Sequence, residues 1–111
     1  MADVFIASFT VVITRGGIYQ PTITFTDADG VVIPVLSAEF IGEPNGASAF
    51  TWNTGNNLFV EASPGVWRFN LDEAATTALT WDAGHYHVSV VDTSGFTIPC
   101  IISGLMFAKD C

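Results

Sequence analysis

The chain has 111 residues, of which 50% are hydrophobic and 13% are charged, and its net charge is −8. This length suits a single core, and this apolar content excludes a disordered chain. An acidic surface repels phosphate backbones, so direct binding to nucleic acid is not expected. Apolar residues never run to about 18 in succession, so no membrane-spanning helix is expected.

The two ends of the chain bear on where the protein is made. Asp3 stands where a signal peptide needs basic residues, so we expect a product of the cytoplasm that is not exported. Cys100 lies in an apolar segment, which predicts a small buried hydrophobe, and the last residue, Cys111, is expected to be frayed. A disulfide between the two is the alternative, which reducing conditions in the cytoplasm disfavour.

Apolar and β-branched segments alternate with turns rich in glycine, proline and asparagine, a pattern typical of strands. The predicted strands are residues 4–14, 18–26, 31–36, 37–43, 49–52, 56–61, 66–71, 84–92 and 96–107. Pro99 and Gly104 mark bulges or an edge in the last strand. A count of about seven to nine close-spaced strands predicts an all-β fold. We expect one antiparallel Ig-like β-sandwich domain over residues 1–111.

Three of the predicted strands have a clear set of inward-facing side chains, because alternate residues of a strand share a face. These sets are Tyr19, Pro21, Ile23 and Phe25, then Trp67, Phe69 and Leu71, then Tyr86, Val88 and Val90. The third set belongs to residues 84–92, which we expect to form the central strand.

One short helical turn is predicted over residues 73–79. Asp72 precedes it and is a good N-cap, because its carboxylate can accept from the free backbone N–H groups of the first turn. Ala75 and Leu79 are four residues apart, so both should face the sandwich.

No group of residues carries a recognisable chemistry. Asp27 and Asp29 match only the start of a calcium-binding loop, because Ala38 stands where the closing glutamate is needed, so a plain hairpin turn is expected. His85 and His87 project from one strand face and supply half of a zinc ligand set, so histidines of a solvent or interface face are the expectation. No nucleophile elbow is present. We therefore expect no enzyme, no metal and no cofactor.

The order of motifs resembles a small β-sandwich domain of tailed-bacteriophage virion proteins, such as the N-terminal domain of siphophage baseplate upper proteins and related stand-alone phage proteins. The resemblance covers about residues 12–108. Its motifs are Arg15-Gly16, the alternating segment Thr22 to Thr26, Asp27-Ala28-Asp29-Gly30, Gly65-Val66-Trp67-Arg68-Phe69-Asn70-Leu71, the turn Glu73 to Leu79, Gly84-His85-Tyr86-His87-Val88-Ser89-Val90 and Asp92-Thr93-Ser94-Gly95. Residues 43–57 depart from it, because they are loop-like where relatives often continue a strand.

The resemblance implies a non-enzymatic structural protein of the virion, in the tail, the baseplate or on the capsid surface. Its partners would be other virion proteins and copies of itself, with no nucleic acid and no membrane. We expect an N-terminal strand or arm over residues 1–14 to pair with a neighbouring subunit, because a long apolar edge strand associates unless it is covered. The candidate contact residues are Val4, Phe5, Ile6, Phe9, Phe50, Trp52 and Trp81.

The alternative is a carbohydrate-binding β-sandwich of an adhesive appendage, because aromatic faces stack on sugars. Trp52 and Trp81 are the candidates for such stacking. Trp67 is predicted to point inward, which weakens this alternative, and an inward packing of Phe50 and Trp52 stays open.

Overall fold

The computed structural model describes residues 4–5, 10–27, 29–32 and 34–110. Most of them lie in strands, with one short helix, α1 (Glu73–Thr77). The strands are β1 (Val4–Phe5), β2 (Val11–Thr14), β3 (Thr22–Thr24), β4 (Thr26–Asp27), β5 (Val35–Pro44), β6 (Phe50–Trp52), β7 (Phe59–Ser63), β8 (Val66–Phe69), β9 (Ala83–Asp92) and β10 (Thr97–Lys109). The prediction of an all-β chain with a short helical turn is confirmed.

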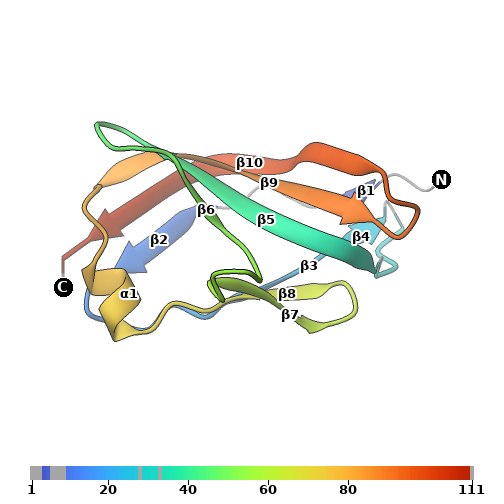
Figure 1. Cartoon of the computed structure of the whole chain (residues 1–111), viewed down its shortest axis with the longest axis horizontal. Helices are drawn as coiled ribbons and strands as arrows, with labels where there is room; N and C mark the ends of the chain where they lie inside the picture. The colour runs from blue at the N-terminus through green and yellow to red at the C-terminus, as the bar shows by residue number, and fades with distance from the viewer. Residues whose placement is uncertain (1–3, 6–9, 28, 33, 111) are drawn as a thin grey trace.

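Two sheets face each other across one core (Figure 1). The larger has the order β2-β10-β9-β5-β6 and the smaller the order β3-β8-β7, while β1 and β4 form a two-stranded ribbon. Taken as strands B to G, the elements β3, β5, β6, β7, β8, β9 and β10 divide as in an immunoglobulin domain, with B, E and D on one sheet and C′, C, F and G on the other. The fold is an Ig-like β-sandwich, as predicted.

The parallel pairing of β2 with β10 departs from the expected antiparallel order. Val12 lies opposite Phe107 and Thr14 opposite Lys109 in this pair. The prediction of one long strand over residues 4–14 also needs correction, because β1 pairs with β4 while β2 joins the larger sheet. Of the proposed contact residues in this segment, Ile6 and Phe9 lie outside the described residues.

The core confirms the alternation read from the sequence. The inward-facing side chains of β8 and β9 are almost fully buried, among them Trp67, Phe69, Tyr86 and Val88. Phe40 of β5 lies at the centre of an aromatic cluster, since its ring centroid is 4.9 Å from that of Trp52 and 4.9 Å from that of Tyr86. Each such buried side chain contributes about 1.5–3 kcal/mol relative to an exposed one. Val88 stands where immunoglobulin domains carry the second cysteine of their inter-sheet disulfide, two residues after the tyrosine.

The predicted helical turn is present in a shorter form. The Asp72 carboxylate accepts a hydrogen bond of 2.8 Å from the Ala75 backbone N–H, which is the expected N-cap. Ala75 and Leu79 are half-buried against the core. Because an isolated helix of this length would not form, packing and the cap hold it.

Several strand boundaries were wrong. The predicted strand 37–43 belongs to β5, which begins at Val35 and so includes only the end of the predicted strand 31–36. β5 has a register shift between Val35 and Ser37 where it pairs with β9. Pro21 is exposed rather than inward, although its carbonyl oxygen accepts a hydrogen bond of 3.0 Å from the Phe69 backbone N–H. The predicted strand 56–61 is displaced toward the C-terminus and corresponds to β7. A turn precedes β7, and in this turn Asn57 has a positive φ of 61°.

The last strand contains a bulge near Pro99, as expected, because its register with β9 shifts between Ile98 and Ile102. Gly104 marks no bulge, since it pairs regularly with Tyr86. The prediction of a buried Cys100 was wrong, because the bulge interrupts the alternation and leaves its side chain exposed. Cys111 lies outside the described residues, so the structure does not test the disulfide.

Candidate interaction surface

The larger sheet has one face in the core and one face directed outward. Residues that alternate with the buried ones on β2, β5, β9 and β10 form this second surface, which we call the outer face. Its main side chains are Val12, Glu39, Ile41, Glu43, His85, His87, Ser89, Ser103, Leu105, Phe107 and Lys109.

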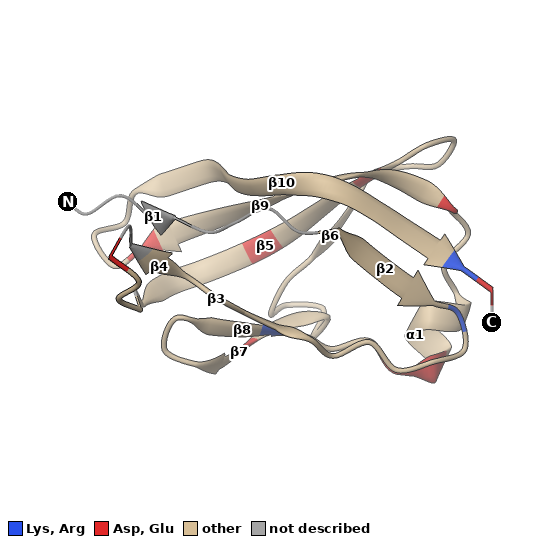
Figure 2. Cartoon of the chain, turned by 180° about the vertical axis from the view of Figure 1, so that it is seen from behind, with Lys and Arg blue, Asp and Glu red and all other residues tan. Residues whose placement is uncertain are grey.

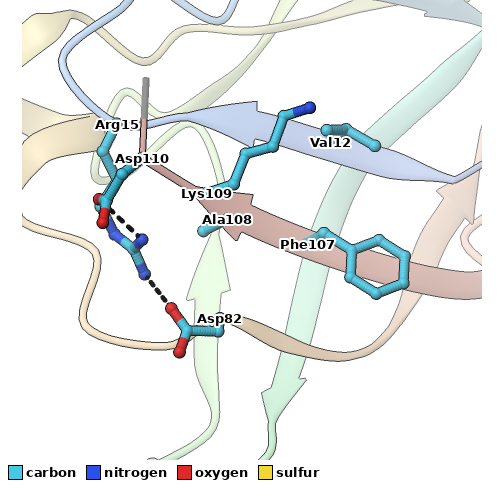
Figure 3. Close-up of a pocket in the computed structure, with 7 residues that line it drawn as sticks. All are labelled: Val12, Arg15, Asp82, Phe107, Ala108, Lys109 and Asp110. Carbon is cyan, nitrogen blue, oxygen red and sulfur yellow. Dashed lines mark hydrogen bonds and ion pairs between the residues drawn. The ribbon is translucent and has the colours of Figure 1, made fainter.

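Three large apolar side chains gather on one side of the outer face, over β2 and β10. Val12 is 43% exposed, Leu105 47% and Phe107 37%. Val12 and Phe107 are register partners across the parallel pair, and Leu105 lies two residues further along β10, on the same face. We call these three residues the apolar strip. Figure 3 shows Val12 and Phe107 on adjoining strands, with Lys109 beside them.

The opposite side of the outer face is acidic. Glu39 and Glu43 lie on β5, and the side chain of Glu43 is 62% exposed. Glu39 accepts a hydrogen bond of 3.2 Å from the side-chain amide of Asn53. We call these two glutamates the acidic pair.

The histidines lie between the apolar strip and the acidic pair. His85 is the register partner of Leu105 on one side and of Glu43 on the other. His87 Nδ1 is 3.8 Å from Glu43 Oε1, a long and exposed contact that contributes little to stability. Within the described part of the chain, no three histidine, cysteine, aspartate or glutamate side chains are arranged to hold a metal ion. The prediction that the histidines belong to an exterior face is confirmed.

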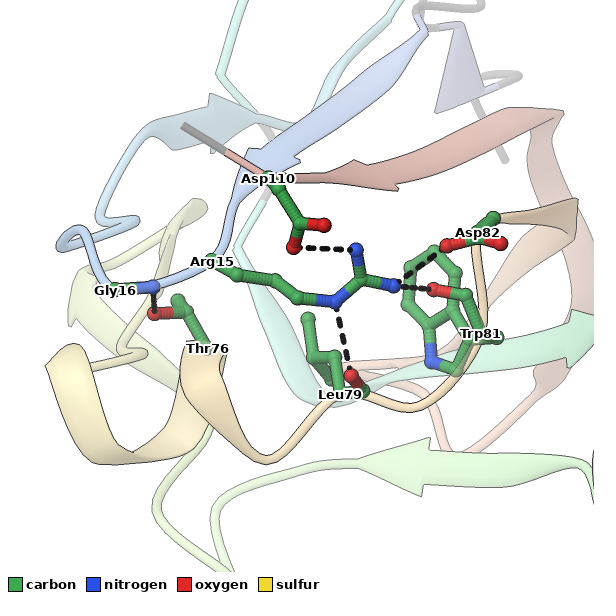
Figure 4. Close-up of polar contacts among 7 residues, drawn as sticks. All are labelled: Arg15, Gly16, Thr76, Leu79, Trp81, Asp82 and Asp110. Atoms are coloured by element: carbon green, nitrogen blue, oxygen red, sulfur yellow. Dashed lines mark hydrogen bonds and ion pairs between the residues drawn. The ribbon is translucent and has the colours of Figure 1, made fainter.

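Arg15 closes the end of the β2–β10 pair (Figure 4). Its guanidinium donates to two backbone carbonyls, that of Leu79 through Nε at 3.0 Å and that of Trp81 through Nη2 at 2.5 Å. It also forms ion pairs of 2.8 Å with Asp82 and 3.2 Å with Asp110. These bonds join the turn after β2 to the segment between α1 and β9.

The charge of Arg15 is already matched by its neighbours. The hydrogen bond with Asp82 is the main cause that raises the pKa of Arg15 above its ordinary value. A shallow hollow of about 550 Å³ lies beside it, lined by Val12, Arg15, Asp82, Phe107, Ala108, Lys109 and Asp110. Arg15 is already paired with Asp82 and Asp110. Lys109 is therefore the unpaired cationic side chain among the residues that line the hollow.

The predicted aromatic contact residues are not on the surface. Trp52 and Trp81 are each only 5% exposed and belong to the core. Phe50 is half-buried, with its ring centroid 4.8 Å from that of Trp52 and 5.8 Å from that of Trp81. The expectation that these three residues form an exposed anchor was therefore wrong, and the inward packing left open by the sequence is what occurs.

The apolar strip was missed by sequence reasoning. The alternation of residues 104–109 gives a signal for Leu105 and Phe107, because Met106 and Ala108 between them are buried. No pattern in the sequence places Val12 beside Phe107, since that contact depends on a pairing between strands at opposite ends of the chain.

Comparisons with known proteins identify no family for this chain. No protein-family model matches the chain, and no curated protein matches it. Among solved structures, one of murine CRIg is similar at 12% identity, with a TM-score of 0.46 over 100% of this chain and 97% of the other. The assignment of the fold rests on the strand order described above, and this likeness says nothing about function.

The described helical structure is limited to α1 and includes no segment long and apolar enough to span a membrane.

Proposed function

We propose that the chain is a non-enzymatic structural protein that assembles with copies of itself and with other proteins of a phage virion. The observation that carries the self-association is the apolar strip. Three large apolar side chains gathered on adjoining strands of an outward sheet face are typical of an interaction site, whereas scattered ones are common on any surface.

The virion setting comes from the order of motifs between Arg15 and Gly95, which resembles phage sandwich domains. That resemblance implies a component of the tail, the baseplate or the capsid surface, made in the host cytoplasm. The net charge of −8 supports protein partners rather than nucleic acid. No catalytic group is part of the resemblance.

The carbohydrate-binding alternative depended on exposed tryptophans, and the structure has none among its described residues. Stacking on a sugar ring needs an accessible aromatic face, and all three tryptophans, Trp52, Trp67 and Trp81, are buried. No buried tryptophan can therefore serve as a sugar-stacking platform.

Self-association is tested by the mass of the purified chain in solution, measured by light scattering behind a sizing column. We expect a discrete oligomer, and we expect the doubly substituted variant Leu105→Glu with Phe107→Glu to be a monomer. Ile18→Glu is the matched control, because Ile18 is 64% exposed but lies outside the outer face. A monomeric wild-type chain at every attainable concentration would contradict the proposal.

The virion setting is tested separately, by mass spectrometry of purified particles from the phage that encodes the chain. Detection of the chain in stoichiometric amounts is the expected result. Its absence from intact particles would contradict a structural role in the virion.

A further inference from the structure

We infer that Asn45 is a site at which the folded chain modifies itself, by slow conversion of this asparagine into aspartate and isoaspartate. Asn45 is followed by Gly46, and no other asparagine of the chain precedes a glycine. The reaction needs a single chain and water but no enzyme, so the inference does not depend on the self-association proposed above.

The reaction is an attack by a backbone nitrogen on the side chain that precedes it. The Gly46 nitrogen loses its proton and bonds to Cγ of Asn45, which releases the side-chain nitrogen as ammonia and leaves a cyclic succinimide. Water then opens this ring at either carbonyl group and gives aspartate or isoaspartate. The net change consumes one water and releases one ammonia, with no oxidation or reduction. A following glycine favours the attack, because it has no Cβ atom to crowd the reacting groups.

The turn between β5 and β6 lies at one end of the sandwich (Figure 1). Asn45 and Gly46 belong to this turn, where residues 45–49 are all exposed, and Gly46 has a positive φ of 76°. An exposed turn changes conformation at less cost than a strand in the core, so the nitrogen can approach Cγ without disruption of the sheet. Exposure also gives water access to the succinimide.

The two reacting groups make no hydrogen bond that would restrain them. The Asn45 backbone N–H donates to the Ala83 carbonyl oxygen at 2.9 Å, which fixes the start of the turn. Within the described part of the chain, the Asn45 side-chain amide and the Gly46 N–H have no hydrogen-bond partner. The attack therefore has no existing bond to break on either side.

The connection between β6 and β7 shows the opposite situation. Asn56 Oδ1 accepts a hydrogen bond of 3.0 Å from the Asn53 backbone N–H, and Asn56 Nδ2 donates to the Thr51 carbonyl at 2.7 Å. The backbone N–H that follows, that of Asn57, donates to the Thr54 carbonyl at 3.1 Å. Both the side chain and the potential attacking nitrogen are therefore held, and an attack at Asn56 must first break these bonds.

Incubation of the full chain in mildly alkaline buffer, folded and in parallel in urea, tests the inference. The product adds one negative charge to a chain that already carries −8 (Figure 2), so ion exchange separates it from the starting protein. Peptide mass spectrometry with electron-transfer fragmentation then locates the change and distinguishes isoaspartate from aspartate. We expect both products at Asn45 of the folded chain before any other asparagine reacts. Asn45→Gln should remove them, because attack on the longer side chain must close a larger ring.

Asn57→Gly supplies a matched comparison within the same chain. It places a glycine after Asn56, at a φ of 61° that glycine adopts readily, so the variant has two asparagine–glycine pairs. We expect the folded variant to react about tenfold more slowly at Asn56 than at Asn45, because the hydrogen bonds of Asn56 must open first. In urea, where these bonds are lost, the two sites should react at similar rates.

Two results would overturn the inference. If Asn45 stays intact in the folded chain but reacts in urea, the turn protects it. If the folded Asn57→Gly variant reacts equally fast at Asn45 and Asn56, the free groups at Asn45 do not set the rate. The mass of the chain in solution enters neither result, so a failure of the proposed self-association is recognised separately.

Discussion

The ring of Phe50 lies directly over Gly42 across the β5–β6 pair. A Cβ atom at Gly42 would be 2.2 Å from Cζ of this ring, a distance that no packed structure tolerates. The absence of a side chain at Gly42 therefore allows Phe50 to pack inward between Trp52 and Trp81. It also explains why Phe50 is not the exposed anchor that the sequence predicted.

Alanine substitutions at two glycines should differ in cost. Gly42→Ala displaces a side chain that can swing outward, so we expect a loss of about 1 kcal/mol of stability and a change in tryptophan emission. At Gly84 the added Cβ would meet backbone, 2.6 Å from both the Glu43 carbonyl oxygen and Pro44 Cα, so we expect Gly84→Ala to cost about 3 kcal/mol. Urea unfolding measures both, and equal losses would contradict this account.

Substitution of Phe40 should give one of the largest losses of stability. Its ring stacks on both Trp52 and Tyr86 and is fully buried, so Phe40→Ala should cost about 3–5 kcal/mol. The control Phe96→Ala, at a side chain that is 62% exposed, should change stability by less than about 0.5 kcal/mol. Denaturant unfolding of both variants gives the comparison, and a small loss at Phe40 would show that the cluster can repack.

Stability should fall in alkali through Tyr19. Burial raises the pKa of Tyr19 from 10.0 to about 12, with a smaller contribution from Tyr86. The folded state thus resists ionisation, so the stabilisation is complete below pH 10 and is lost as the pH rises toward 12. Two pKa units correspond to about 2.7 kcal/mol, which solvent screening at this half-buried ring reduces to about 1 kcal/mol.

Tyr19→Phe isolates this effect, because it keeps the edge-on contact with Phe69 at 5.3 Å. We expect the variant to lose less stability than the wild-type chain between pH 9 and pH 11.5, about half a unit short of the Tyr19 pKa, in urea titrations. Identical alkaline profiles would exclude Tyr19 as the cause.

Replacement of Arg15 by lysine should lower the midpoint of thermal unfolding although the charge is kept. Lysine lacks the planar fork that reaches the carbonyls of Leu79 and Trp81 together. Arg68→Lys, at an exposed position of β8, is the control and should leave the midpoint unchanged. If both variants unfold at the wild-type temperature, Arg15 does not hold the end of the β2–β10 pair.

Cys100 should react with a thiol reagent in the folded chain, because its side chain is exposed at the bulge of β10. A Cys111→Ser background removes the second thiol, and further substitution of Cys100→Ser gives the blank. If Cys100 reacts only after the chain unfolds, its side chain is buried in solution, as the sequence predicted.

Local sequence pattern was enough to predict the inward faces of several strands and the short helical turn. Alternation fixed the inward faces of β8 and β9, because a strand buries every second residue whatever its partner. The Asp72 cap and the turn after it were predicted for the same reason, since a capping bond joins residues only three apart. The Ig-like strand count and the absence of a recognisable catalytic motif were also visible in the sequence.

Tertiary structure decided what no local pattern contains. Cys100 is exposed because it lies in a bulge of β10, where four steps from Ile98 to Ile102 oppose only two on β9, and the residues within a bulge leave the regular alternation. Trp52 and Trp81 are buried because residues far apart in the chain enclose them, and Val12 reaches Phe107 only through the parallel pairing of β2 with β10. The outer face depends on that pairing, because its apolar strip comes from strands near the two ends of the chain, which only the folded sheet brings together.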